Sequence, residues 1–149
     1  MINDFYKKYI IAVTGYAGDG KTTTITKLYD KLASTGKISA VRHIWGVPDI
    51  NNPTYDFSLI GNSRYGATGF VSRGDQIYAL RDDLEYLAKE DCQVIVCACR
   101  KECPDTYKAV AEISWRYGYY IDWADFSVPP GMSKDDYTEQ LSLDLYLLF

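Results

Sequence analysis

Histidine and long apolar runs are scarce in this chain of 149 residues, which holds one histidine, His43, and four cysteines. The cysteines form no C-x-x-C pair and His43 lies far from them in the sequence, so their spacing gives little support to a zinc site. The longest apolar run near the N-terminus, Tyr9–Val13, is far shorter than the roughly 20 residues of a membrane-spanning helix. We therefore expect no membrane segment and no export signal, and a cytoplasmic protein with reduced thiols.

An excess of positive charge is also missing. The chain carries 16 basic and 20 acidic residues, for a formal net charge of −4. Such a balance provides no broad electrostatic surface for duplex nucleic acid or an anionic membrane. Hydrophobic residues make up 47% and charged residues 24% of the chain, which is ordinary for a globular protein. The length suits one domain, and we expect a single domain over residues 1–149.

Strand-like and helical patterns alternate along the chain. Short apolar runs predict strands, and apolar residues spaced by three and four predict helices. The predicted strands cover residues 9–13, 38–45, 55–60, 68–72, 92–99 and 119–123, and the predicted helices 21–33, 75–89, 104–117 and 134–148. This order predicts an α/β fold, a three-layer sandwich with a mainly parallel central sheet. Ligands of such folds bind beyond the carboxyl ends of the strands.

A glycine-rich stretch joins the first predicted strand to the first predicted helix. It reads Gly15-Tyr16-Ala17-Gly18-Asp19-Gly20-Lys21-Thr22 and matches G-x-x-x-x-G-K-[ST] at every fixed position. Such a loop turns its backbone N–H groups toward phosphate oxygens, and the helix that follows adds its positive end. Lys21 can reach the β- and γ-phosphates, and the Thr22 hydroxyl can ligate Mg²⁺. Thr23 is expected near the α-phosphate.

In this stretch the sequence resembles the P-loop NTPase superfamily, whose Walker A motif has this form, and it is most like a small P-loop kinase. The resemblance covers the first third of the chain. It implies a P-loop NTPase-like fold that binds ATP, or another nucleoside triphosphate, together with Mg²⁺. The sequence shows neither the sensor and arginine-finger motifs of larger ATPases nor the N-K-x-D motif of GTPases.

Two strand ends depart from the pattern of that superfamily. The apolar run 94–99 is followed by Arg100 where an aspartate is usual, and the first carboxylate after it is Glu102. Arg100 and Arg73 each follow a predicted strand, so we expect both in the crevice with Lys21, where they would neutralise a transferring phosphoryl group. The alternative is that either arginine is an ordinary solvated surface charge.

The acid that assists the metal must then come from elsewhere. Asp75 is the first candidate, because it lies at a predicted strand-to-helix junction, where its alternative role is a helix N-cap. Asp56 is the second, although the pattern places it near the start of a strand and so at the wrong end of a parallel sheet. Asp49, in the loop after the second strand, is the third.

These features predict a small phosphotransferase that moves the γ-phosphoryl group of ATP to a nucleotide or another small acceptor. Two alternatives stay open. One is an NTPase or nucleotide-dependent switch acting on a protein partner, for which the apolar tail Leu145–Phe149 offers an association surface, including association with a second copy of the chain. The other is a protein that binds nucleotide without catalysis.

Overall fold

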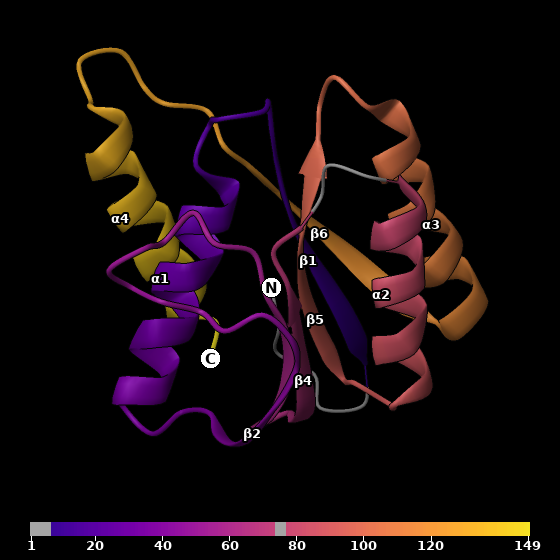
Figure 1. Ribbon diagram of the computed structural model, residues 1–149. Helices are drawn as coiled ribbons and strands as arrows, with labels where there is room; N and C mark the ends of the chain where they lie inside the picture. Colours follow the sequence, from indigo (N-terminus) through magenta and orange to yellow (C-terminus); the bar gives the residue numbers. More distant parts are fainter. Residues whose placement is uncertain (1–6, 74–76) are drawn as a thin grey trace.

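Six strands and four helices alternate along the part of the chain that the computed structural model describes, residues 7–73 and 77–149 (Figure 1). The strands are β1 (Lys8–Gly15), β2 (Ser39–Trp45), β3 (Ser58–Ser63), β4 (Gly66–Val71), β5 (Val94–Arg100) and β6 (Tyr119–Asp125). The helices are α1 (Lys21–Ser34), α2 (Ile77–Lys89), α3 (Pro104–Tyr117) and α4 (Lys134–Tyr146). The predicted α/β alternation is confirmed, and most element ends shift by a few residues, as is usual for ends that fray.

The strands form a single mixed sheet in the order β2-β3-β4-β5-β1-β6. The pairs β4–β5, β5–β1 and β1–β6 are parallel, whereas β2–β3 and β3–β4 are antiparallel. The expected mainly parallel sheet is therefore found only from β4 to β6. The difference arises from a tight hairpin: Ser63 pairs with Gly66, so the predicted turn over residues 61–66 shrinks to Arg64 and Tyr65. As a result, β3 begins at the edge where the other strands end.

Helices cover both faces of the sheet (Figure 1). Apolar residues of α1 and α4 pack on one face, and those of α2 and α3 pack on the other. Successive residues of β1 serve the two cores alternately: Ile11 and Val13 join the first, and Ile10 and Ala12 join the second. This alternation follows from the two-residue period of a strand, and burial on both faces explains why Tyr9–Val13 of β1 is a continuous apolar run.

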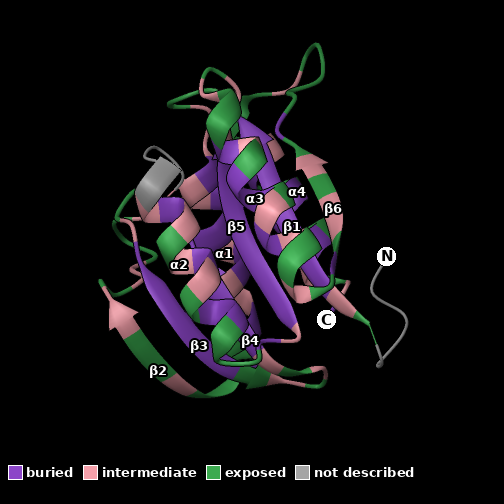
Figure 2. Cartoon of the chain, turned by 90° about the vertical axis from the view of Figure 1, so that its right-hand side faces the viewer, coloured by how far each residue is buried: buried purple, intermediate pink, exposed green. Residues whose placement is uncertain are grey.

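The two outer strands differ from the central ones in exposure (Figure 2). In β5, the residues from Val94 to Cys99 are buried, and Arg100 at the end of the strand is partly exposed. β2 is largely exposed, carries His43 on its outside, and shifts register twice against β3. Among the described residues, no helix has both the length and the apolar character needed to cross a bilayer.

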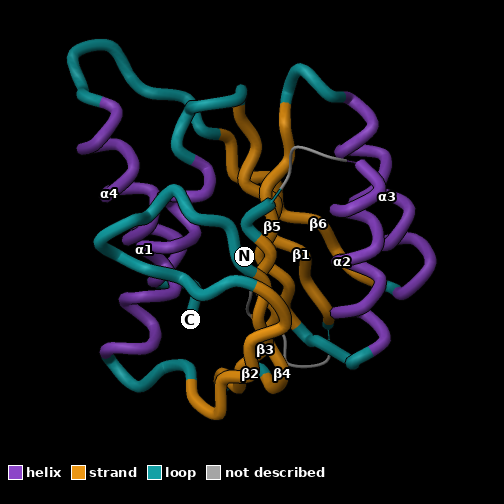
Figure 3. The backbone as a smooth tube through the Cα atoms, in the orientation of Figure 1, coloured by secondary structure: helices purple, strands orange, loops and turns teal. Residues whose placement is uncertain are grey.

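The loops that follow β1, β5 and β6 gather at one edge of the sheet, at the top of Figure 3. This is the edge predicted to bind ligands, since the parallel strands end there. The loop from β2 to β3 returns to the same edge, because β3 runs in the opposite direction. Segments that are far apart in the sequence are thereby brought around the Gly15–Thr22 loop.

Candidate functional site

The Gly15–Thr22 loop leaves the carboxyl end of β1 and enters α1 at Lys21. Its backbone depends on glycine at position 20, where φ is 121°, a value that other residues rarely adopt. No side chain among the described residues caps the start of α1. The start of α4, by contrast, is capped by Ser133, whose hydroxyl accepts from the Asp136 N–H. The first turn of α1 thus keeps N–H groups available for an anion.

Lys21 lies inward from this loop, with only 8% of its surface exposed. Its Nζ donates to the carbonyl oxygens of Gly15 and Tyr16, at 3.0 Å and 2.7 Å. Burial lowers the pKa of Lys21 below its usual value, and the positive charge of Arg100 lowers it further, while Asp19 and Glu102 act in the opposite direction. Within the described part of the chain this buried ammonium group is held by carbonyl oxygens, which suits it to receive a negatively charged ligand.

A cavity of about 500 Å³ opens beside the loop. One wall is made by the loop and the first turn of α1, namely Ala17, Gly18, Gly20, Lys21, Thr22 and Thr23. The facing walls come from other elements and comprise Pro53, Thr54, Asp56, Ser72, Arg100, Lys134 and Asp135. Five separate segments therefore meet at one concave site, which is the usual form of a small-ligand pocket.

Asp56 lies in this cavity, where its carboxylate joins two hydroxyl groups. The Oδ1 atom accepts from Thr22 Oγ1 at 3.1 Å and from Ser72 Oγ at 3.2 Å. Gly46 permits this placement: a Cβ atom there would lie 2.5 Å from the Asp56 carbonyl oxygen. The second acid candidate, Asp56, thus lies at the cavity although it precedes a strand, because β3 is antiparallel and starts at the edge of the sheet that carries the loop.

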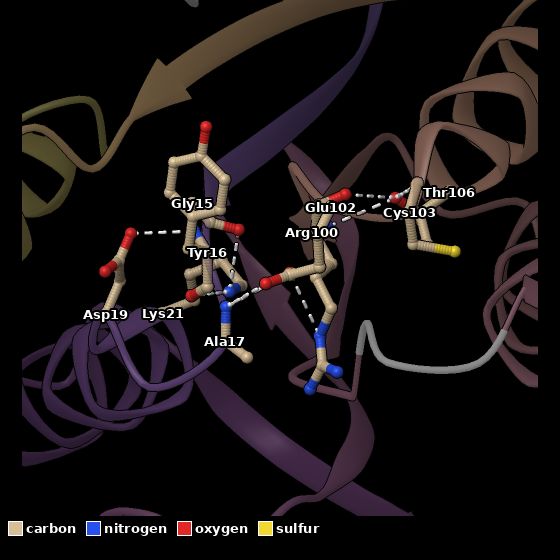
Figure 4. Close-up of polar contacts among 9 residues, drawn as sticks. All are labelled: Gly15, Tyr16, Ala17, Asp19, Lys21, Arg100, Glu102, Cys103 and Thr106. Atoms are coloured by element: carbon tan, nitrogen blue, oxygen red, sulfur yellow. Dashed lines mark hydrogen bonds and ion pairs between the residues drawn. The ribbon is translucent and has the colours of Figure 1, made fainter.

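Arg100 ends β5 at the same edge, and the turn that follows it is tied together by one buried hydroxyl (Figure 4). The Oγ1 atom of Thr106 accepts from the Arg100 N–H at 3.1 Å and lies 3.2 Å from the Arg100 carbonyl oxygen and 2.8 Å from that of Cys103. The Lys101 N–H donates to the Gly15 carbonyl oxygen at 2.9 Å. These bonds fix the turn directly against the Gly15–Thr22 loop.

Two acidic side chains hold N–H groups of the loop (Figure 4). Asp19 Oδ2 accepts from the Tyr16 N–H at 2.7 Å. Glu102 accepts from the Ala17 N–H with Oε1 at 3.1 Å and Oε2 at 3.0 Å, and its Oε1 lies 3.5 Å from Arg100 Nε. The bond from Ala17 lowers the pKa of Glu102, with Arg100 and Lys21 adding to the effect. Glu102 is therefore a carboxylate at this site.

Two described residues that the sequence analysis proposed, Arg73 and Asp49, do not line the cavity. Arg73 pairs with Asp83 of α2, at 3.1 Å between Nη2 and Oδ2, and its guanidinium stacks 4.3 Å from the centre of the Trp45 ring. It is not among the described residues that line the cavity. Asp75 lies outside the described residues. Asp49, the third acid candidate, is bonded to the Asn51 N–H and to Asn52 within its own loop.

Several contacts of the site were not predicted from the sequence, among them those of Ser72, Glu102 and Lys134. Ser72 holds Asp56, Glu102 holds Ala17, and Lys134 donates to the Gly18 carbonyl oxygen from the start of α4. The position of Glu102 two residues beyond a strand end was the only local signal among them. Lys134 and Ser72 depend on contacts between distant segments, which no spacing in the sequence reports.

No protein-family model matches the sequence, and searches of curated proteins and of solved structures return no match.

Proposed function

We propose that the protein is a P-loop phosphotransferase that uses ATP and Mg²⁺ to phosphorylate a nucleotide or another small acceptor. The observation that supports it best is the cavity wall formed by Ala17–Thr23, with Lys21 buried at its centre and the start of α1 uncapped by any described side chain. Backbone N–H groups and an ammonium group directed at one point are the arrangement that binds a chain of phosphates.

The residues around Thr22 fit a hard divalent cation. Thr22 Oγ1 and the Asp56 carboxylate lie within 3.1 Å of each other at the cavity. Mg²⁺ prefers such oxygen ligands and keeps several waters, so one hydroxyl and one nearby carboxylate suffice from the protein. Bound there, Mg²⁺ would neutralise charge on the β- and γ-phosphates. Asp56 takes the place that the sequence analysis gave first to Asp75.

Arg100 is a further positive group of the cavity, beside the loop at the end of β5, where it pairs with Gly15. It lies close enough to Lys21 to lower the pKa of that residue. An arginine at this place can stabilise the charge that spreads over the transferring phosphoryl group. Arg73 is tied to Asp83 and is left out of this role.

A nucleotide-dependent switch or NTPase is the second candidate. The cavity extends past the loop to Lys134 and Asp135 of α4, so a ligand there would touch the C-terminal helix. Contact between a bound nucleotide and a terminal helix would couple binding to the surface that a protein partner meets.

The test is a screen of nucleoside triphosphates and small phosphoacceptors by ADP release, with and without Mg²⁺. We expect turnover that needs both Mg²⁺ and an acceptor. Turnover without any acceptor would favour the NTPase, and binding without turnover would contradict both enzyme functions.

Lys21→Ala tests the phosphate-binding role of the loop, and Lys31→Ala is its control. The variant should keep its fold and lose much of its affinity for ATP, because Lys21 faces the cavity. Lys31→Ala, a change of the same type at the other end of α1, removes a surface ion pair with Glu139 and should leave binding unchanged. Equal ATP affinity in Lys21→Ala and the wild type would refute the phosphate-binding role of the loop.

A further inference from the structure

Glu102 differs from Asp19 in where it comes from, although both hold N–H groups of the same loop (Figure 4). Asp19 belongs to the loop and bonds to Tyr16, three residues away. Glu102 is brought by the turn after β5 and bonds to Ala17 across 85 positions of sequence. It is therefore an anion supplied by another element to a loop that lines the cavity.

The Glu102 carboxylate uses the groups that a phosphate would need. It accepts from the Ala17 N–H and lies 3.5 Å from Arg100 Nε. Ala17 and Arg100 both line the cavity. Anions at such loops are held by backbone N–H groups and positive side chains, and a carboxylate and a phosphate oxygen compete for the same donors.

We propose that Glu102 is an internal competitor of the phosphate chain: its carboxylate occupies the Ala17 N–H in the ligand-free protein and leaves it when a nucleoside triphosphate binds. This inference rests on the proposed function, because it takes phosphates as the ligand of the loop. The side chain of Glu102 is 41% exposed, so it can rotate into solvent without opening the core. Its departure also frees Arg100 from a carboxylate neighbour and leaves that charge for the ligand.

The backbone of the turn does not need to move for this exchange. Thr106 holds Arg100 and Cys103 through its buried hydroxyl, and the Lys101 N–H is bonded to Gly15. The release is thus a side-chain rotation about a fixed turn. A competing internal contact lowers the apparent affinity by the fraction of molecules in which the site is open. For one charge-assisted bond at a partly exposed position we expect a factor of about three to ten.

The experiment compares the dissociation constant of MgATP for the wild type, Glu102→Ala and Glu102→Asp by titration calorimetry. Glu102→Ala should bind about three- to tenfold more tightly, because the competitor is gone. Glu102→Asp keeps the charge but shortens the reach, so it should resemble Glu102→Ala. The control is Asp105→Asn, which removes an exposed acid of the same region that pairs with Lys108; it should bind as the wild type does.

An NMR measurement tests the contact without any ligand. In the ligand-free protein, Glu102→Ala should move the Ala17 amide proton upfield, since its hydrogen bond is lost. The Tyr16 amide proton, held by Asp19, should stay in place and serves as the internal control.

The two hypotheses fail in different ways. MgATP affinity that is equal or weaker in Glu102→Ala, or an Ala17 amide proton that does not move, would overturn the competitor role alone. No binding of MgATP to the wild type or to any variant would overturn the proposed function and the competitor role with it.

Discussion

The carboxylate of Asp56 connects three parts of the chain through two hydroxyl groups. Thr22 belongs to the first turn of α1, and Ser72 follows β4. Ser72 also donates from its backbone N–H to the Phe57 carbonyl oxygen at 3.1 Å, and its Oγ accepts from the Phe57 N–H at 2.9 Å. The bonds between Phe57 and Ser72 join the two ends of the β3–β4 hairpin, and Ser72 in turn bonds to Asp56. This holds the Asp56 side chain in a fixed direction toward Thr22.

Replacing this carboxylate by an amide tests its role as a metal-assisting acid. Asp56→Asn keeps the size of the side chain and removes the charge, so the Mg²⁺ concentration needed for half-maximal turnover should rise by about 10- to 100-fold. Asp49→Asn makes the same change earlier in the β2–β3 loop, at a residue that is not among the described residues lining the cavity, and should leave the Mg²⁺ requirement unaltered. A Mg²⁺ dependence that is the same in both variants would remove Asp56 from the metal site.

A second prediction at the residue scale concerns the Cys92 thiol and the pH dependence of the free energy of unfolding. The residue is fully buried, and burial raises the pKa of its thiol from 9.0 to about 12, with Glu90 and Asp91 adding to the rise. The unfolded chain ionises first as the pH increases, so the stability that the neutral thiol contributes is present below pH 9 and is lost above it. The free-energy advantage of the wild type over Cys92→Ala should therefore shrink by about 2 kcal/mol between pH 8 and pH 10.5.

Urea unfolding of both proteins across this pH range measures the difference directly. Other groups that titrate in the same range are shared by the two proteins and cancel. A gap between the two proteins that is constant with pH would mean that the thiol has the same pKa in the folded and unfolded states.

At the scale of elements, the turn between β5 and α3 decides how two charged side chains meet the loop. Thr106 is buried, and its one hydroxyl serves the backbone of Arg100 and Cys103. The turn brings Arg100 to the cavity and Glu102 to the Ala17 N–H. Lys101 pairs with Asp125 at the end of β6, at 2.6 Å. The Thr106 hydroxyl therefore holds the strand-to-helix connection together with backbone bonds such as that from Cys103 N–H to the Arg100 carbonyl oxygen.

Thr106→Val should destabilise the protein by about 1–3 kcal/mol, because valine keeps the shape but leaves the Arg100 N–H without its acceptor. Thr106→Ser retains the hydroxyl and should cost much less. Urea unfolding compares the two variants. Equal stability of the valine and serine variants would show that the hydroxyl does not hold the turn.

The elements themselves could be predicted because apolar periodicity is a local property. The direction of β3 could not, since it depends on how few residues form the turn at Arg64 and Tyr65. A turn over residues 61–66 is compatible with either strand direction, whereas a two-residue turn between paired strands requires an antiparallel hairpin. The position of Asp56 followed from that direction, which is why the pattern placed it at the wrong end.

In the candidate site, too, the features that are local in sequence could be predicted and those that depend on strand pairing could not. The Gly15–Thr22 loop could be located because its spacing is contained in eight consecutive positions. Ser72, Lys134 and the contact of Glu102 with Ala17 depend on which strands become neighbours, and neighbours are chosen by the packing of the whole sheet. Arg73 was predicted at the cavity because it follows a strand, but its side chain pairs with Asp83 of α2 and stacks on Trp45 instead.

At the scale of the whole molecule, the sheet separates two apolar cores that each hold a pair of helices. The distance between α2 and the sheet is set in part by Gly69 of β4. A Cβ atom there would lie 2.8 Å from Leu87 Cδ1 and 2.9 Å from Cδ2. Leu87 is fully buried, so it has little room to withdraw.

Gly69→Ala should therefore cost about 1–3 kcal/mol of stability through overpacking. Leu87→Ala alone should cost about 2–5 kcal/mol through the cavity that it leaves. In the double variant the added methyl group occupies part of that cavity, so the combined cost should be less than the sum of the two. Urea unfolding of the four proteins gives the coupling energy, and strict additivity would show that the two side chains do not meet.

The place of β1 in the sheet has a consequence for how the chain is made. β1 precedes the other described strands in the chain, yet its two neighbours are β5 and β6, the last two of the described strands. At a ribosomal rate of about 5–20 residues per second, the apolar strand and its loop wait roughly 5 to 20 seconds for both partners. Lys134, which reaches Gly18, is made later still. The nascent chain therefore carries β1 and the Gly15–Thr22 loop without their final neighbours for that time, and the apolar strand needs protection from aggregation until those neighbours are made.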